Sequence, residues 1–584
     1  MTPRDELIAI QKRIVDRLKD EIESSVGRIA PAVTLYYEEY WKEFETGYGR
    51  VSSKRELLQA AAKASILYCG DYHTLRQSQA TALRLIEDLS REREVIVAIE
   101  MIAIEDQASI DAYLDGRLDD IQLLKAIDYA NTWDFHWPPY RAILDFCRRR
   151  GLRVVGINCD PSSDRSDRIL ERDFRAAETI VRETEARPEA LVFVFDGDLH
   201  VARDHLPLIV DSLLRRKRLE RRRLIVHQNV ESIYWRLAEE HLERVVDCVR
   251  LAEDSFCVLT ATPLVKLQSY LNWEQNHAEL SPVVHPDWRH RGDEDDDDAD
   301  DADDAPDYGE QIHEIVKTIA GFLEIDEPGL DDFIVYTAGD LGFLEALERD
   351  PRFGPHDILE IKRQIAASES YFIPRANVIY LADLSLHRAA EEASHFLNTL
   401  CAGWNGTARP RSRRDAFYFK TIVEALGFFG SRIIDPKRAC LSERDHVELV
   451  LRTKRKRLDL AGSEIRTMAR EVLRHLAAER RYLRTRRFPP LRRLYEESSR
   501  VVDAAAHGLG YILGDKLYNA MIEGEVLKDE VRALFYEPFA SEGDAFKTYL
   551  RWVERLNHVP HDHPVGSESF LVRTAGSGAS ALRL

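Results

Sequence analysis

Between residues 61 and 275, short runs of consecutive apolar residues alternate with segments in which apolar residues recur at helical spacing. Runs of this kind, bounded by polar residues, are typical of strands that are buried on both faces. Strands that alternate with helices predict an α/β domain with a mostly parallel sheet and flanking helices. The predicted strands are 65–70, 94–99, 153–158, 191–196, 223–228 and 256–260, and the predicted helices are 75–92, 139–150, 167–185 and 203–217.

The pattern differs on either side of this region. Residues 1–60 are predicted to be a helical segment, with an apolar stripe that predicts either a docking helix or a contact in a homo-oligomer. We predict an acidic linker at residues 276–310, a mainly α-helical second domain at residues 311–563, and a flexible tail rich in Gly and Ser at residues 564–584. The apolar stripe consists of Leu7, Ile10, Ile14, Leu18 and Ile22.

Charge is concentrated in the linker. Eleven of the 15 residues from Asp293 to Asp307 are acidic and none is basic, in a chain of 584 residues with a net charge of −20. Without these eleven acids the charge is about −9, so the overall charge says little about partners. We interpret the run as a disordered, solvated linker, and an acidic interaction segment is the alternative.

The chain has the features of a reduced cytoplasmic protein. It contains no run of 18 apolar residues, and its N-terminus lacks the apolar stretch of a signal peptide and a lipobox cysteine. Its seven cysteines are scattered without a C-x-x-C pair. We therefore predict a cytoplasmic location and no membrane span.

One tetrapeptide pattern, Gly-Asp-x-His, occurs twice, each time directly after a predicted strand. The copies are Gly70-Asp71-Tyr72-His73 and Gly197-Asp198-Leu199-His200, and Glu100 follows a third strand. The carboxyl ends of parallel strands meet at one edge of the sheet, where ligands bind. A divalent metal ion is the simplest way to satisfy these acids and imidazoles together, and such ligands suit Mn, Fe, Co or Zn.

This interpretation assigns roles to individual residues. His73, His200 and Glu100 are predicted metal ligands, and Glu100 or Asp71 could act as the catalytic base. Gly70 and Gly197 would let the backbone turn sharply and give a ligand close access. Alternatively, the two aspartates cap helices and the two histidines are core residues.

Two further residues are candidate ligand-binding groups. Arg172 would face an anionic group, unless Arg172-Asp173 simply begins a helix whose dipole the aspartate suits. Tyr140 could line a pocket together with Trp133 and Trp137, although a plain core role is favoured for these aromatic residues.

The order of these motifs resembles the ChaN-like domain of the Tiki, TraB and erythromycin-esterase superfamily. The resemblance covers about residues 62–265. Besides the two Gly-x-x-His motifs, it rests on Ala98-Ile99-Glu100-Met101, Gln107, Leu114-Asp115-Gly116, Trp133, the segments 140–146 and 151–158, and Arg172-Asp173.

The resemblance implies two functions. Tiki-like members are metal-dependent hydrolases, whose centre would map onto His73, Glu100 and His200. ChaN-like members are haem-binding proteins of iron uptake with a tyrosine-type iron ligand, for which Tyr68, Tyr72 and Tyr140 are the nearby candidates. The chain departs from the family in lacking a lipidation signal, and it has Asp71 where many relatives have glutamate.

The helical half offers a weaker signal. His387, Glu391 and His395 are four residues apart, and Glu392 with His395 forms a Glu-x-x-His spacing known from metal sites in helical bundles. The second copy of that motif is missing, so we favour a solvated polar stripe. The basic segment 452–493 is interleaved with acids and poor in aromatic residues, so we do not expect nucleic acid binding.

Three hypotheses follow for the function. The first is a metal-dependent hydrolase acting on a small ester, an amide or a peptide. The second is a haem-binding, iron-handling protein without hydrolytic activity. The third is a catalytically inactive scaffold whose helical half acts through protein contacts.

Overall fold

The computed structural model divides the chain into two compact units, which we call the sheet unit and the helical unit. It describes residues 2–26, 31–133, 135–159, 168–278, 308–337, 340–366, 369–382, 385–404, 412–453, 460–561 and 569–570. The sheet unit is Ile14–Ala302 with Pro564–Val572, and the helical unit is Met1–Arg13 and Asp303–His563 with Arg573–Leu584. The acidic run 293–307 lies outside the described residues.

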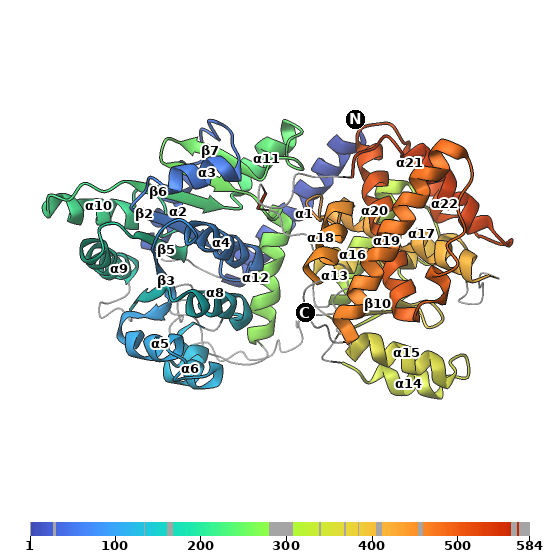
Figure 1. Cartoon of the computed structure of the whole chain (residues 1–584), viewed down its shortest axis with the longest axis horizontal. Coiled ribbons are helices and arrows are strands. Elements are labelled where there is room, and N and C mark those ends of the chain that lie inside the picture. Colours follow the sequence, from blue (N-terminus) through green and yellow to red (C-terminus); the bar gives the residue numbers. More distant parts are fainter. Residues whose placement is uncertain are drawn as a thin grey trace. The chain divides into compact units, whose positions relative to one another are not determined.

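An eight-stranded, mostly parallel sheet forms the centre of the sheet unit (Figure 1), as the sequence predicted. The strand order is β1-β7-β8-β6-β2-β5-β3-β4, and only the pairs β1·β7 and β7·β8 are antiparallel. The edge strand β1 and its neighbour β7 were not predicted. The strands are β1 (Arg50–Val51), β2 (Ile66–Asp71), β3 (Val95–Ala103), β4 (Arg153–Asn158), β5 (Leu191–Gly197), β6 (Arg223–Gln228), β7 (Cys248–Ala252) and β8 (Ser255–Val258).

Helices cover both faces of this sheet. Along β2, Leu67 and Cys69 face one core while Ile66 and Tyr68 face the other, as the alternation of a strand requires. The first core contains residues of α3, α4, α5 and α8, and the second contains residues of α9 and α10. The helices of this part of the chain are α1 (Pro3–Val26), α2 (Pro31–Lys42), α3 (Lys54–Ala61), α4 (Arg76–Leu89), α5 (Gln107–Leu114), α6 (Asp120–Ala126), α7 (Tyr129–Thr132), α8 (Trp137–Arg150), α9 (Arg168–Ala186), α10 (Leu206–Arg216), α11 (Glu231–Glu239) and α12 (Pro263–Ala278).

The register of the central strands brings the two motifs to the same edge. β5 lies between β2 and β3, with Asp71 opposite Gly197 and Ile99 opposite Phe195. The turns after β2 and β5 and the end of β3 therefore leave the sheet side by side.

The helical unit is built mainly of α-helices, as predicted, but it also contains a small sheet that was not predicted. Its strands β9 (Ile334–Thr337), β10 (Tyr371–Ile373) and β11 (Val378–Leu381) have the order β10-β11-β9. The long helix α17 packs against both α16 and α20. The helices are α13 (Tyr308–Leu323), α14 (Phe343–Arg349), α15 (Pro355–Ala366), α16 (Leu386–Cys401), α17 (Arg413–Ile434), α18 (Glu443–Thr453), α19 (Leu460–Thr485), α20 (Ser499–Ile522), α21 (Lys528–Phe535) and α22 (Asp544–Arg555).

Described residues near both ends of the sequence are buried in these units. Leu7, Ile10 and Leu18 of the apolar stripe are buried, and Ile14 and Ile22 are half-buried. In the segment expected to be a flexible tail, Phe570 is fully buried, and its backbone N–H donates to Asp247 at 2.6 Å.

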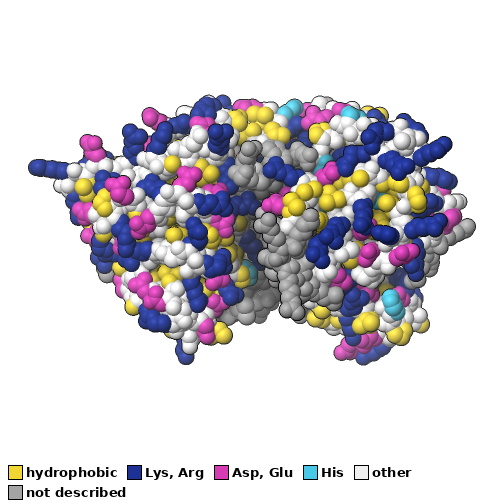
Figure 2. Space-filling view, in the orientation of Figure 1, with side chains coloured by type: hydrophobic (Ala, Val, Ile, Leu, Met, Phe, Trp, Pro, Cys, Tyr) yellow, Lys and Arg dark blue, Asp and Glu magenta, His cyan; other side chains and the backbone are white. Residues whose placement is uncertain are grey.

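The distribution of surface charge and the apolar character of the helices concern possible binding to nucleic acid and to membranes. On the face shown in Figure 2, Lys and Arg side chains are interspersed with Asp and Glu rather than gathered into one unbroken band. Within the basic segment, Arg474 pairs with Glu471 and Arg480 with Glu443. Among the helices of the described residues, none is both long enough and apolar enough to cross a membrane.

Candidate metal centre

The three predicted metal ligands surround one point at the carboxyl edge of the sheet. A Cβ atom added to Gly197 would lie 3.5 Å from Nε2 of His73 and 3.5 Å from Oε2 of Glu100. It would also lie 3.2 Å from Cδ2 of His200. Gly197 therefore leaves open the space that these side chains share.

His73 is held in place by a buried aspartate. Its Nδ1 lies 3.0 Å from Oδ2 of Asp71, and its Nε2 lies 3.5 Å from Oε2 of Glu100. Asp71 in turn accepts hydrogen bonds of 2.6 Å from the Tyr140 hydroxyl and 2.6 Å from Nε2 of Gln79. Both carboxylate oxygens of Asp71 are thus engaged, which suits a residue that orients His73.

His200 is held by a second aspartate in the same way. Its Nδ1 lies 2.6 Å from Oδ1 of Asp173 on α9, and the other oxygen of Asp173 accepts from the hydroxyl of Tyr36 on α2. The two histidines therefore have the same kind of support: Nδ1 of each lies against a buried aspartate that accepts a hydrogen bond from a tyrosine. Fixing Nδ1 directs the second ring nitrogen to the site, as second-sphere carboxylates do for metal-bound histidines.

Both imidazoles are surrounded by carboxylates, whose negative charges raise the pKa of each ring. Burial lowers the pKa of His73, but the negative charges of Glu100 and Asp71 outweigh it, so the pKa lies above its ordinary value. Burial likewise opposes the charged form of His200, yet Asp173 and Asp196 raise its pKa to about 10. The site thus favours a positive charge at these positions.

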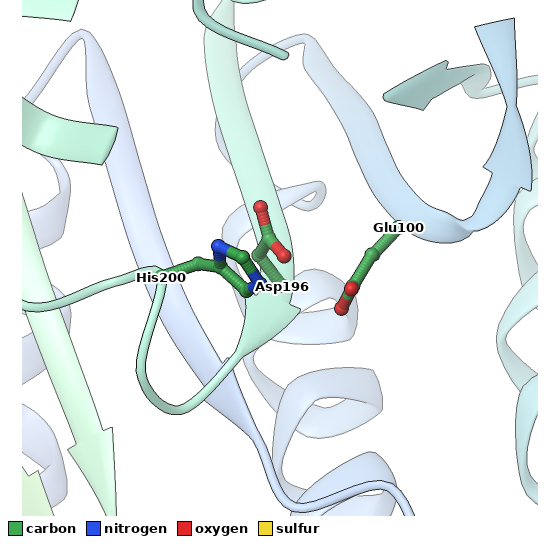
Figure 3. Close-up of side chains that lie close together, drawn as sticks. All are labelled: Glu100, Asp196 and His200. Atoms are coloured by element: carbon green, nitrogen blue, oxygen red, sulfur yellow. The ribbon is translucent and has the colours of Figure 1, made fainter. Parts of the chain in front are cut away.

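Two buried carboxylates complete the cluster (Figure 3). One ligand atom each of Glu100, Asp196 and His200 lies within 4.8 Å of the other two. Among the described residues His73 is not in this group, although its Nε2 lies 3.5 Å from Oε2 of Glu100. The backbone N–H of Gly197 is 2.9 Å from Oε2 of Glu100 and 2.9 Å from Oδ1 of Asp196. Burial and then the charge of Glu100 raise the pKa of Asp196 well above its ordinary value. A bound cation would relieve this repulsion between the two carboxylates.

Asp196 was missed by the sequence prediction, which placed Asp198 in the cluster instead. Asp198 forms a 2.8 Å ion pair with Lys266, and among the described residues it is not in the group that could hold an ion. Its Oδ1 would lie 2.6 Å from a Cβ on Gly70, so Gly70 makes room for this carboxylate. The signal for Asp196 was its place between the apolar strand and Gly197.

The other two predicted residues lie beside the cluster. Arg172, half-buried on α9, contributes positive charge near Glu100. Burial raises the pKa of Glu100, but the charges of His73 and His200, a hydrogen bond with Asp196 and the charge of Arg172 bring it below its ordinary value. Tyr140 is buried and directs its hydroxyl to Asp71.

Aromatic rings pack around His73. The ring centroids of Trp133 and Phe135 lie 4.6 Å and 4.8 Å from that of His73. Trp137 packs instead against Tyr129, at 5.4 Å. Tyr68, one of the tyrosines considered as an iron ligand, is fully buried.

Comparisons with solved structures give two weak similarities. The chain shares 13% identity with ChaN of Campylobacter jejuni, in a structure described as "Cofacial heme binding to ChaN of Campylobacter jejuni", with a TM-score of 0.25 over 31% of this chain and 88% of that chain. It shares 15% identity with the type III effector HopBA1, with a TM-score of 0.23 over 36% of this chain and 95% of that chain.

A search of curated proteins gives no match. The comparison with protein families does give one, to the family described as "Haem-binding uptake, Tiki superfamily, ChaN", over residues 57–166. These residues include Gly70, Asp71, His73, Glu100 and Tyr140 of the site. The sheet unit therefore contains a ChaN-like domain of the Tiki superfamily.

Proposed function

We propose that the ChaN-like domain binds one divalent transition-metal ion and hydrolyses a small ester, an amide or a peptide. His73 and His200, together with Glu100 or Asp196, would hold the ion. The observation that carries this proposal is that both histidines are supported in the same way. A buried aspartate lies against Nδ1 of each ring, which leaves the second ring nitrogen for the ion.

The donor set fits such an ion. Two imidazoles and one or two carboxylates suit Mn, Fe, Co or Zn and leave coordination positions for water and substrate. When bound, an ion of this kind lowers the pKa of a coordinated water and so supplies a nucleophile near neutral pH. Burial and the charge of Asp71 or Asp173 keep Tyr140 and Tyr36 protonated, because they raise the pKa of each phenol well above its ordinary value.

The carboxylates have separate tasks in this proposal. Asp71 and Asp173 position the imidazoles and do not contact the substrate. Glu100, or Asp196 where Glu100 is a ligand, would accept and return a proton as the general base.

Metal analysis of the full chain, purified without a histidine tag, tests the binding step. We expect His73→Ala and His200→Ala each to lose one equivalent of metal relative to the wild type. His356→Ala is the matched control, because His356 is exposed and lies in the helical unit. Equal metal content in all four proteins would overturn the proposed site.

The hydrolytic step is tested with p-nitrophenyl acetate and a fluorogenic peptide mixture. Turnover should require metal, disappear after chelation, return when the ion is restored, and be absent from His73→Ala. A protein that binds its metal but shows no metal-dependent turnover would refute hydrolysis and leave metal binding standing.

Haem binding is the second candidate function. Two observations favour it: the family description of the matched segment, and the aromatic rings of Trp133 and Phe135 against His73. It predicts a Soret band on haem titration of chelator-treated protein, diminished in His73→Ala. If neither metal nor haem binds, the inactive scaffold is the remaining hypothesis.

A further inference from the structure

A second group of glutamates and histidines lies inside the helical unit, between α16, α17 and α20. The sequence pattern on α16 was interpreted as a solvated stripe, but Glu391 is 3% exposed and Glu392 is 6% exposed. That interpretation is therefore wrong for these two residues. Buried carboxylates need a cation or hydrogen-bond donors.

Three side chains of this group come close enough to bind one ion. A ligand atom of Glu391, one of His395 and one of Glu424 all lie within 4.8 Å of one another. The first two lie on α16 and the third on α17. His387, the other histidine of the stripe, lies with its ring against Ser385 Oγ at 3.0 Å and is not in the group.

The ring of His395 is held as the two histidines of the sheet unit are. Its Nδ1 lies 3.0 Å from Oε2 of Glu392, and that oxygen also accepts the backbone N–H of Phe372 at 2.9 Å. Its Nε2 is buried and has no hydrogen-bond partner among the described residues. A Cβ on Gly427 would lie 2.4 Å from this Nε2, so the nitrogen faces α17 one turn after Glu424.

The two glutamates have supports of their own. Nδ1 of His507 on α20 lies 2.7 Å from Oε2 of Glu424. Glu391 accepts hydrogen bonds of 2.8 Å from Arg438 and 2.5 Å from the Tyr511 hydroxyl. Each carboxylate is thus fixed in orientation, and outer contacts of this kind accompany metal ligands.

A closed network of ion pairs is the competing explanation. It accounts for Arg438 on Glu391 and for His507 on Glu424, but it leaves Nε2 of His395 unsatisfied. A buried ring nitrogen without a partner costs free energy, whether it carries a proton or a lone pair. An ion bound to Nε2 removes that cost and also neutralises the carboxylates.

We propose that Glu391, His395 and Glu424 form a second metal site, which binds a divalent first-row transition ion. One imidazole and two carboxylates suit Mn²⁺, Fe²⁺, Co²⁺ or Zn²⁺. The side chains of His395 and Glu424 are each 14% exposed, so the site is not sealed from solvent. This site is independent of the proposed centre in the ChaN-like domain.

A titration with Co²⁺ tests the proposal, because the visible absorption of Co²⁺ changes when it exchanges water for protein ligands. The titration uses the full chain carrying His200→Ala, which removes a ligand of the first centre. We expect one equivalent of Co²⁺ to bind, and we expect binding to be at least tenfold weaker after the additional change His395→Gln or Glu424→Gln.

Gly427→Ala provides a variant without a change of charge, since its methyl group would meet Nε2 of His395. Gly321→Ala is its control, because a Cβ at that position would meet no described atom within 4 Å beyond its chain neighbours and the backbone of its own helix. Circular dichroism must show the native helix content in each variant that is scored.

The outcomes separate the two sites. No Co²⁺ binding by the folded His200→Ala protein, or equal binding by its His395→Gln and Glu424→Gln derivatives, would overturn the second site. Loss of binding only in the latter two supports it, whatever the result at the first centre. Co²⁺ binding at the first centre is measured separately, by comparing the His395→Gln protein with the protein that carries both His395→Gln and His200→Ala.

Discussion

The backbone N–H of Gly197 donates a 2.9 Å hydrogen bond to Oε2 of Glu100, so the end of β5 directly orients the carboxylate on β3. The same glycine borders the space that His73 and His200 share. Gly197 therefore both holds one ligand of the proposed centre and keeps the centre open.

Replacing Gly197 with alanine should fill the centre. The added methyl group would lie 3.2 Å to 3.5 Å from the three ligand side chains, which is close contact rather than a severe clash. We therefore expect Gly197→Ala to fold with a melting midpoint within a few degrees of the wild type but to lose one equivalent of metal. Metal analysis and a thermal melt check this, with Gly321→Ala as control.

Asp71→Asn should weaken metal binding without abolishing it. The amide keeps the shape of the side chain but removes the charge that orients His73 and increases its basicity, and such outer contacts are worth about 10–100-fold in affinity. Competition with a chromophoric chelator measures the change. Asp173→Asn should weaken metal binding in the same way, through His200. Asp115→Asn is the control and should not change metal binding, because the carboxylate of Asp115 is 65% exposed.

The buried ion pair of Arg432 and Asp515 should matter for stability. Both side chains are 1% exposed. Removing one partner of such a pair leaves the other charge buried, so Arg432→Met should lower the free energy of unfolding by about 3–5 kcal/mol.

Urea unfolding measures this loss. The exposed pair of Arg349 and Glu345, at 79% and 73%, is the comparison, and Arg349→Met should cost about 0–1 kcal/mol. Similar losses for both variants would contradict the argument.

The stability of the helical unit should decrease as the pH falls, because of His446. This residue is 1% exposed, and burial lowers its pKa to about 4. An unfolded histidine has a pKa of about 6.5, so between pH 6.5 and pH 4 the unfolded state binds more protons than the folded state. Stability is then lost over this window, by up to about 3 kcal/mol, and is fully present above it.

His446→Phe keeps a ring in this place and removes the titrating group. The urea midpoint of the wild type should decrease as the pH is lowered from 7.5 to 5. The urea midpoint of His446→Phe should decrease less over the same range. His356→Phe, at an exposed position, should follow the wild type. An unchanged pH dependence in His446→Phe would argue against this role of His446.

Six of the eight strands of the large sheet could be predicted, because each is a run of consecutive apolar residues. Such runs are typical of strands that helices cover on both faces of the sheet. The two-residue edge strand β1 and its neighbour β7 carry no such run. The three strands of the helical unit have three or four residues each, too few to display a period among helices.

The candidate site was predictable where chemistry lies directly after a strand, as for His73, Glu100 and His200. Tyr36 and Asp173 were not assigned to it, because they come from helices distant in the sequence and reach His200 only through packing. On α16, the burial of Glu391 depends on Arg438 and Tyr511 from outside that helix, so the local pattern resembled an exposed face.

The boundary between the two units falls within α1, since Met1–Arg13 belongs to the helical unit and the chain from Ile14 to the sheet unit. Pro564–Val572 returns to the sheet unit after the helical residues. A single cut in the acidic run would therefore leave the released C-terminal half without Leu7 and Ile10, and the N-terminal half without Phe570. Fragments divided there would each expose a piece of core, and dissecting this protein requires rejoining distant stretches of its chain.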